Sequence, residues 1–385
     1  MISNLTFAKR NISSLNLFEE ITLSESCLIA AFALILVTGV FGNAFVIFIF
    51  GNKKSNHRST TDSLILYLGI VDFLTSFFNP LLYIYWTITK YQRWDFGNLG
   101  CQIIPSIGPI MTSVSSGLLL ILAIDRYIAI VTPFYGQLTP KTVTIAFILD
   151  IFLSILSFLH YILALRIHPT YNYCYIPNMA DYKYGLPNCS FIILRLSIFS
   201  IVFGFTNIKI FRTLKKCSVN IKSKEVRVER LKQSKKITVV LLTMGLVFIL
   251  LVFPRELFYL VIHITLIDGK KNAAKFSNTL MVINSWLKVA HTANSCANVF
   301  IYSHMQTKYR KQIIRILASF GCCKKTFSRQ SISVSILSYI RDRGRFSSRN
   351  YRQEFKKILL TQEEDSISSA DAVFFQRAQQ WKVKV

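Results

Sequence analysis

Charged residues are scarce in this 385-residue chain, at 17% of the sequence, whereas an ordinary soluble domain has roughly 25%. Acidic residues are the scarcest, because 19 Asp and Glu stand against 45 Lys and Arg, giving a formal net charge of +26. Glycine (15) and proline (9) are too few, and Phe (31) and Tyr (17) too many, for a disordered or collagen-like chain.

An excess of positive charge usually suggests a nucleic-acid-binding protein, but the distribution of the charge here argues otherwise. Leu28–Phe50 contains no charged residue, and the Lys and Arg residues crowd between and after such apolar stretches. We therefore expect a lipid bilayer, and no nucleic acid, among the partners. No nucleophile–base motif, phosphate-binding loop or zinc-ligand spacing occurs in the sequence, so it does not suggest an enzyme.

Seven segments are long and apolar enough to cross a bilayer as helices, which takes about 20 residues each. They are Leu28–Phe50, Asp62–Thr89, Gly100–Thr132, Thr142–Leu165, Cys189–Leu214, Ile237–His263 and Asn278–Ser303. None shows the short alternating strands of a membrane barrel. The sequence therefore predicts an all-α membrane protein, with a seven-transmembrane helix bundle over residues 28–304.

The loops between these segments predict the orientation. Loops on one side carry 14 Lys and Arg and loops on the other side carry 7, and the more positive side normally faces the cytosol. We expect a multi-pass plasma-membrane protein with an extracellular tail over residues 1–27. That tail has no apolar core of a signal peptide, so the first span is expected to direct insertion. Asn4 and Asn11 begin glycosylation triplets in it.

Four of the cysteines can be assigned roles from their depth. Cys101 opens the third span from outside and Cys174 lies in the second external loop, where the compartment is oxidising. A disulfide between them would tie this loop across the mouth of the bundle; two free thiols are the alternative. Cys322 and Cys323 follow a basic amphipathic stretch after the last span. This context favours palmitoylation and an amphipathic cytosolic helix over residues 305–320.

The rest of the chain, residues 321–385, has many Arg, Lys and Ser and no long apolar run. This composition predicts a disordered cytosolic tail. Several of its serines lie among basic residues, as kinase targets often do, and phosphate there would add charge that an arrestin-type partner could bind.

The third span carries Asp125-Arg126-Tyr127 at its cytosolic end, and Arg126 lies 25 residues after Cys101, or about 37 Å of helix. Here the sequence resembles the rhodopsin-like G-protein-coupled receptors and, loosely, invertebrate neuropeptide receptors. Further matching residues, at least one in most of the expected spans, are Asn43, Asp72, Pro254, Asn298 and Tyr302. The resemblance covers residues from about 28 to 320. It implies that Arg126, with Asp125, Tyr127 and Tyr302, meets a heterotrimeric G protein when the bundle opens.

A buried polar cluster is expected around Asp72, because a carboxylate in the middle of a membrane is costly unless it has partners. Ser115 lies at mid-depth in the third span, and Asn294, Ser295 and Asn298 lie on or beside one face of the seventh. All are oxygen ligands, which suits a hard cation. The resemblance implies a sodium ion at this site; a plain hydrogen-bond network is the alternative.

The resemblance implies that two residues of the expected ligand pocket exclude two ligand classes. Gly108 stands where amine receptors have an Asp, and Thr292 where opsins have the retinal-binding Lys. Four ionisable residues lie high in the bundle: Arg195, Arg255, Glu256 and Lys288. For Arg195, a side chain that extends towards the outer surface is the favoured interpretation. The excess of cations favours a peptide with an acidic end, unless Lys288 pairs with Glu256 and neutralises the pocket.

Three residues depart from the family pattern where activation is transmitted. Phe199 replaces a Pro in the fifth span, Val252 replaces a Trp in the sixth, and Val299 replaces a Pro in the seventh. A receptor that binds its ligand without signalling is therefore an alternative to a G-protein-coupled receptor for a peptide. A seven-helix transporter is a weaker alternative, because no internal repeat is evident.

Overall fold

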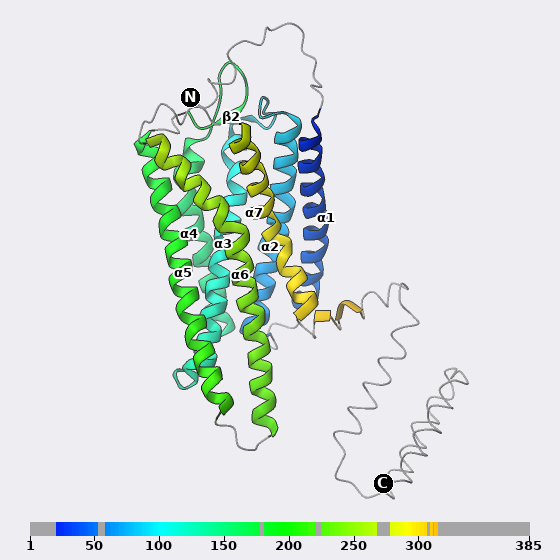
Figure 1. The fold of residues 1–385 in the computed structure, drawn as a ribbon, viewed down its shortest axis with the longest axis vertical. Coiled ribbons are helices and arrows are strands. Elements are labelled where there is room, and N and C mark those ends of the chain that lie inside the picture. The colour runs from blue at the N-terminus through cyan, green and yellow to red at the C-terminus, as the bar shows by residue number, and fades with distance from the viewer. Residues whose placement is uncertain are drawn as a thin grey trace, which may run out of the picture. The chain divides into compact units, whose positions relative to one another are not determined.

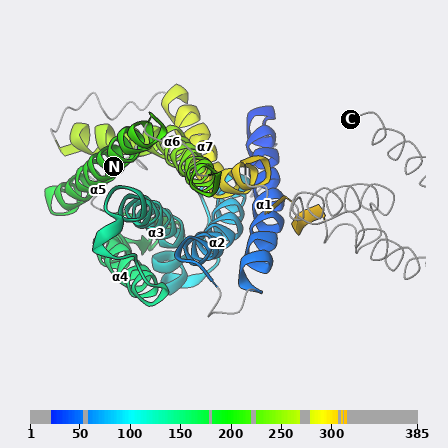
Figure 2. The same ribbon diagram turned by 90° about the horizontal axis from the view of Figure 1, so that it is seen from below.

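The computed structural model describes residues 21–52, 58–177, 181–219, 225–267, 278–305, 309–310 and 312–314. Seven long helices make up most of this part of the chain and lie side by side (Figures 1 and 2). They are α1 (Leu23–Gly51), α2 (Thr60–Ile88), α3 (Gly97–Val131), α4 (Pro140–Ala164), α5 (Tyr182–Val219), α6 (Glu225–Ile267) and α7 (Asn278–Met305). The all-α bundle predicted from the apolar segments is therefore present.

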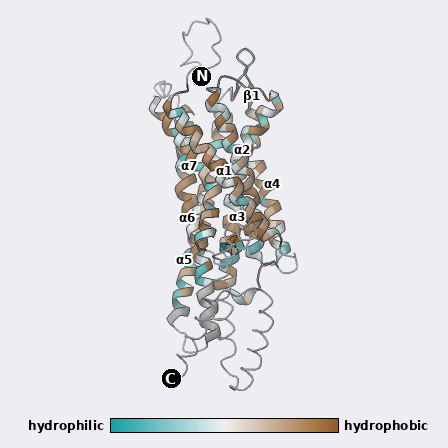
Figure 3. Cartoon of the chain, turned by 90° about the vertical axis from the view of Figure 1, so that its right-hand side faces the viewer, coloured by the Kyte–Doolittle hydropathy of each residue, from teal (hydrophilic) through white to brown (hydrophobic). Residues whose placement is uncertain are grey.

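Six of these helices, α1 to α6, are long and apolar enough to cross a membrane, and apolar residues dominate much of the bundle (Figure 3). Helix α7 is more polar, because its buried residues include Thr292, Asn294, Ser295 and Asn298. These side chains point into the bundle rather than towards lipid, so their polarity is compatible with a seventh span. The chain is a multi-pass membrane protein.

Several helices begin earlier than the apolar segments that predicted them. Helix α1 begins at Leu23 because Thr22 and Glu25 form a capping box, in which each side chain accepts a hydrogen bond from the other residue's backbone N–H. Helices α5 and α6 have polar turns beyond the apolar part and extend furthest at the end opposite β2 (Figure 1). An apolar run marks only the part of a helix that lipid would cover, so it underestimates helix length.

Helix α3 lies against four others, α2, α4, α5 and α6 (Figure 2). Its buried residues Val114, Leu118 and Leu122 form part of the core. By contrast, only Val143 and Ser154 are buried in α4, while many of its large apolar side chains are exposed, as expected of a helix that faces lipid. The residues that can form a site therefore come mainly from α2, α3, α5, α6 and α7.

A short hairpin between α4 and α5, which the sequence did not predict, marks one end of the bundle. Strand β1 (Arg166–Ile167) pairs antiparallel with β2 (Cys174–Tyr175). We call this the disulfide end, since Cys174 lies in β2. The opposite end, where α3 finishes with Asp125-Arg126-Tyr127 and a 3-10 turn, Pro133–Tyr135, follows, is called the triplet end.

Part of the predicted cytosolic region remains a prediction. Residues 309–310 and 312–314 have helical backbone, but most of the proposed amphipathic helix over 305–320 lies outside the described residues. The same holds for the tail over 321–385, for the palmitoylation candidates Cys322 and Cys323, and for the glycosylation candidates Asn4 and Asn11.

Candidate functional site

The predicted disulfide is present and joins the hairpin to α3. Cys101 and Cys174 are bonded, with their Cα atoms 5.6 Å apart. Cys101 is fully buried and packs in a cluster with Leu82, Trp94 and Leu165. The hairpin is therefore fixed against the ends of α2 and α3, and the alternative of two free thiols is excluded.

The loop between α2 and α3 also has a fixed conformation at this end. Arg93 Nε donates a hydrogen bond of 2.6 Å to Asp95 Oδ1, and this guanidinium lowers the pKa of the Asp95 carboxyl. Lys90 and Tyr91 precede this pair with positive φ angles of 52° and 58°. Two consecutive non-glycine residues in the left-handed region are unusual and indicate a turn that the surrounding contacts hold in place.

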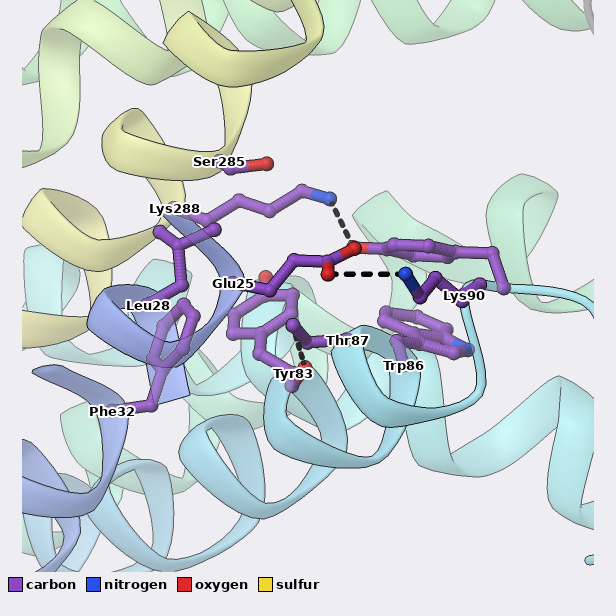
Figure 4. Close-up of a pocket in the computed structure, with 10 residues that line it drawn as sticks. Glu25, Leu28, Phe32, Tyr83, Trp86, Thr87, Lys90, Ser285 and Lys288 are labelled. Atoms are coloured by element: carbon purple, nitrogen blue, oxygen red, sulfur yellow. Dashed lines mark hydrogen bonds and ion pairs between the residues drawn. The ribbon is translucent and has the colours of Figure 1, made fainter. Parts of the chain in front are cut away.

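A cavity of about 180 Å³ lies beside this turn, between α1, α2 and α7. Figure 4 shows its side chains, among which Glu25 and Lys90 form an ion pair of 3.1 Å. The lining residues are Glu25, Leu28, Phe32, Tyr83, Trp86, Thr87, Lys90, Tyr91, Ser285 and Lys288. Apart from Lys288, the sequence analysis did not single out any of these; the spacing Thr22-x-x-Glu25, which signals a capping box, could have drawn attention to Glu25.

Lys288 extends into this cavity from α7. Its Nζ donates a hydrogen bond of 2.8 Å to the Tyr91 hydroxyl (Figure 4). The same atom lies 4.9 Å from the centroid of the Tyr91 ring and 5.5 Å from that of Tyr83. The sequence-based alternative in which Lys288 pairs with Glu256 is wrong, because Lys288 instead faces α2 and the turn that follows it.

Arg255 of α6 lies close to the same aromatic side chain. It is buried, with 8% of its surface exposed, and its Nη2 donates a hydrogen bond of 3.4 Å to the Tyr83 hydroxyl. Its guanidinium carbon lies 5.1 Å from the ring centroid of Tyr259. Arg255 Nε makes no hydrogen bond within the described part of the chain.

Glu256, the next residue of α6, pairs with Arg195 of α5. From α7, Nε2 of the buried His291 lies 3.7 Å from Glu256 Oε1. Arg195 also lies over the ring of Phe158, at 5.1 Å. The expectation that Arg195 extends towards the surface is therefore wrong: its charge is satisfied inside the bundle by Glu256. Adjacent residues on a helix point in different directions, which explains why Arg255 and Glu256 have different partners.

Gly108, the remaining pocket candidate, is buried in α3 against Asn79 of α2. A Cβ atom at this position would lie 2.0 Å from Asn79 Oδ1. Gly108 therefore permits the close approach of α2 and α3, which is a packing role that the sequence comparison with amine receptors could not indicate.

In the middle of the bundle, the Asp72 carboxylate accepts hydrogen bonds from two of its expected partners. Asn298 Nδ2 donates to one oxygen at 2.9 Å, and the Ser115 hydroxyl donates to the other at 3.4 Å. Ser295 instead accepts a hydrogen bond of 2.7 Å from Ser76. No hydrogen bond joins the buried Asn294 to Asp72 within the described residues. The structure thus brings three of the five predicted residues into direct contact.

At the triplet end, Arg126 Nη2 lies 2.5 Å from Asp125 Oδ2. The other oxygen of Asp125 accepts a hydrogen bond of 2.9 Å from the Thr60 hydroxyl, at the start of α2. The buried Tyr302 hydroxyl has no hydrogen-bond partner in the described part of the chain, and the ring of Tyr127 lies 6.0 Å from Phe205 of α5. Arg126 is thus paired with its neighbour Asp125. Thr60, which the sequence analysis missed, binds the same carboxylate.

Comparison with known proteins shows the family to which a chain with these two ends belongs. The family model of the seven-transmembrane receptors of the rhodopsin family matches residues 42–302. The chain belongs to this family. It is a rhodopsin-like G-protein-coupled receptor, and the resemblance inferred from the sequence motifs is confirmed.

Three relatives show the range of similar receptors. The receptor is 26% identical over 319 residues to C-X-C chemokine receptor type 1 of Oryctolagus cuniculus, covering 80% of this chain and 83% of the relative. It is 24% identical to neuropeptide Y receptor type 6 of Mus musculus, over 89% of this chain and 94% of the relative. It is 34% identical to the gonadotropin-releasing hormone receptor of Octopus vulgaris, but over only 40% and 38% of the two chains.

Proposed function

We propose that the receptor binds a peptide at the disulfide end and, in response, catalyses nucleotide exchange on a heterotrimeric G protein at the triplet end. The observation that carries the proposal is the arrangement of Arg126: it is paired with Asp125, which Thr60 of α2 also binds. An arginine that is held inside the bundle can become available to a partner only when the helices around it move apart, which a bound ligand would have to favour.

The relatives support a peptide as the ligand, since their names give a chemokine, a gonadotropin-releasing hormone and a neuropeptide. The charged and aromatic side chains at the disulfide end are compatible with this ligand class, because a peptide offers both ionic groups and apolar side chains.

The proposed orientation places the disulfide end and the N-terminus outside the cell, at the plasma membrane. The excess of Lys and Arg in the loops of the triplet end supports it. An oxidising exterior is also the compartment in which a disulfide persists. On the cytosolic side, kinases and an arrestin-type partner would act on the serine-rich tail.

A sodium ion is the proposed allosteric ligand of the Asp72 cluster. Asp72 is buried, with 1% of its surface exposed, and no cationic side chain pairs with it among the described residues. Carboxylate, hydroxyl and amide oxygens are suitable ligands for a hard cation, so Asp72, Ser115 and Asn298 fit the ion. Bound there, sodium would supply the positive charge that the buried carboxylate lacks.

The test is a nucleotide-exchange assay on purified G proteins with the full-length receptor in lipid nanodiscs and a peptide library. At least one peptide should accelerate exchange, and Arg126→Ala should abolish that acceleration while leaving peptide binding intact. Peptide binding without exchange on any G-protein class would contradict coupling and support the non-signalling alternative, which the replacement of two activation residues by Val252 and Val299 favours.

A further inference from the structure

Among the described residues, the disulfide end of the bundle contains two cations that no carboxylate pairs with. Arg255 and Lys288 form no ion pair within the described residues, and both contact Tyr83, one at its hydroxyl and the other over its ring. The nearby acids are already used, since Glu256 pairs with Arg195 and Glu25 pairs with Lys90. Counted over the described residues, the region around Tyr83 therefore has two positive charges in excess.

Such an excess is unfavourable in the unliganded receptor. Removing a charged group from water is costly unless a counter-charge or hydrogen bonds compensate it. Each cation donates one hydrogen bond to a tyrosine hydroxyl and lies over tyrosine rings, but neither kind of contact supplies a counter-charge. Because the two cations also repel each other, a bound anion between them would relieve both penalties at once.

The geometry identifies the kind of anion. Arg255 Nε is buried and has no hydrogen-bond partner among the described residues, so this N–H is still available to donate to an acceptor. A guanidinium edge matches the two oxygens of a carboxylate, and the Lys288 ammonium adds a point charge. Leu28, Phe32 and Trp86 line the adjacent cavity of about 180 Å³ (Figure 4), which suits an apolar side chain beside the anion.

We infer that Arg255 and Lys288 bind the free C-terminal carboxylate of the activating peptide, and that the cavity between α1, α2 and α7 takes the apolar side chain of its last residue. This inference rests on the proposed function. It assigns the ligand class as a peptide acid with an apolar C-terminal residue, as opposed to a C-terminal amide. The Glu25–Lys90 pair is neutral overall, so it does not change the charge that the peptide meets.

The assignment can be tested without the natural peptide or a G protein. The full-length receptor in nanodiscs is titrated with N-acetylphenylalanine or with N-acetylphenylalaninamide at constant ionic strength, and its Tm is recorded. A ligand that binds only the folded state raises the Tm in a saturable manner. We expect this rise with the acid and not with the amide; equal effects of the two compounds, or no effect of the acid, would overturn the assignment.

Variants locate the site. Arg255→Gln and Lys288→Gln should each weaken binding of the acid about tenfold or more, because each removes a charge-assisted hydrogen bond. Arg93→Gln is the matched control, since it removes a cation at the same end whose guanidinium is exposed and pairs with Asp95; its affinity for the acid should equal that of the wild type. Equal losses in all three variants would indicate only a general effect of charge and would overturn the site.

Further measurements distinguish a peptide terminus from a fatty acid, and a ligand-binding role of the two cations from a structural one. Stabilisation by decanoate but not by N-acetylphenylalanine would assign the site to a fatty acid and overturn the peptide terminus. Without ligand, Arg255→Gln and Lys288→Gln should not lower the Tm, because an uncompensated cation is removed; a marked fall would mean that the cations stabilise the fold. If the acid binds as expected but no peptide accelerates nucleotide exchange, the proposed function fails and the carboxylate site stands.

Discussion

Glu256 of α6 is bound by Arg195 of α5, and His291 of α7 approaches the same carboxylate to 3.7 Å. The Glu256 carboxylate therefore lies where α5, α6 and α7 meet, in the half of the bundle nearest the disulfide. Phe199 and Phe253 lie at the same level, where they line a small pocket together with this ion pair. The ion pair connects α5 to α6, and Val252, which stands where the family has a tryptophan, lines the same pocket.

Reversal of one charge in this pair should destabilise the receptor. Arg195→Glu places two acids together in a partly buried site, and breaking a buried pair typically costs about 3–5 kcal/mol. We expect a lower Tm for Arg195→Glu and a largely restored Tm for the double variant Arg195→Glu/Glu256→Arg. The exposed pair Arg93–Asp95 is the control, and its reversal should change stability by about 1 kcal/mol or less. Additive losses in the double variant would show that the two residues do not interact.

The hydrogen bond from Thr60 to Asp125 should restrain basal activity. Thr60→Val removes the hydroxyl and keeps the side-chain shape, so Arg126 is the one side-chain partner left to Asp125 in the part of the chain that the structure describes. We expect basal nucleotide exchange to rise a fewfold in Thr60→Val and to be abolished in Arg126→Ala. Thr144→Val, which removes a hydroxyl that contacts Tyr67, is a control for the loss of a threonine hydroxyl near this end. An unchanged basal rate in Thr60→Val would mean that this bond does not stabilise the resting state.

Sodium should stabilise the receptor through Asp72. With ionic strength held constant by N-methyl-D-glucamine chloride, we expect the Tm of the wild type to rise with sodium concentration. Asp72→Asn should remove this dependence, because the charge that attracts the cation is lost. Ser76→Ala is the matched control: Ser76 contacts Ser295 rather than Asp72. A sodium effect of equal size in Asp72→Asn would leave the cluster as a hydrogen-bond network only.

The two cysteines of the disulfide should contribute to the stability of the receptor as a single unit. The bond closes a long loop between α3 and β2, over a sequence separation of 73 residues, and such bonds typically contribute about 2–4 kcal/mol. Cys101→Ser, Cys174→Ser and the double variant should reduce surface expression and Tm to the same extent. A double variant that is clearly worse than either single variant would indicate separate roles for the two residues.

The sequence by itself determined the number and order of the long helices, although not the residues at which each begins and ends. These features are local: about 20 consecutive apolar residues define a span, and the rise of a helix fixes the distance between Cys101 and Arg126 at about 37 Å. The disulfide was predictable because Cys101 and Cys174 stand where the family resemblance implies a bonded pair. Depth alone did not single out this pair, since Cys27 and Cys189 were expected near the same face.

Only the tertiary structure decided which polar side chains are partners. Glu256 binds Arg195 and not Lys288, Ser295 binds Ser76 and not Asp72, and Thr60 binds Asp125. Each of these contacts joins two different helices. Which residues meet depends on the rotation and relative depth of both helices. Close packing between helices, such as that of the Asn79 side chain against the backbone of Gly108, sets those quantities. The spacing of residues within one helix fixes neither of them.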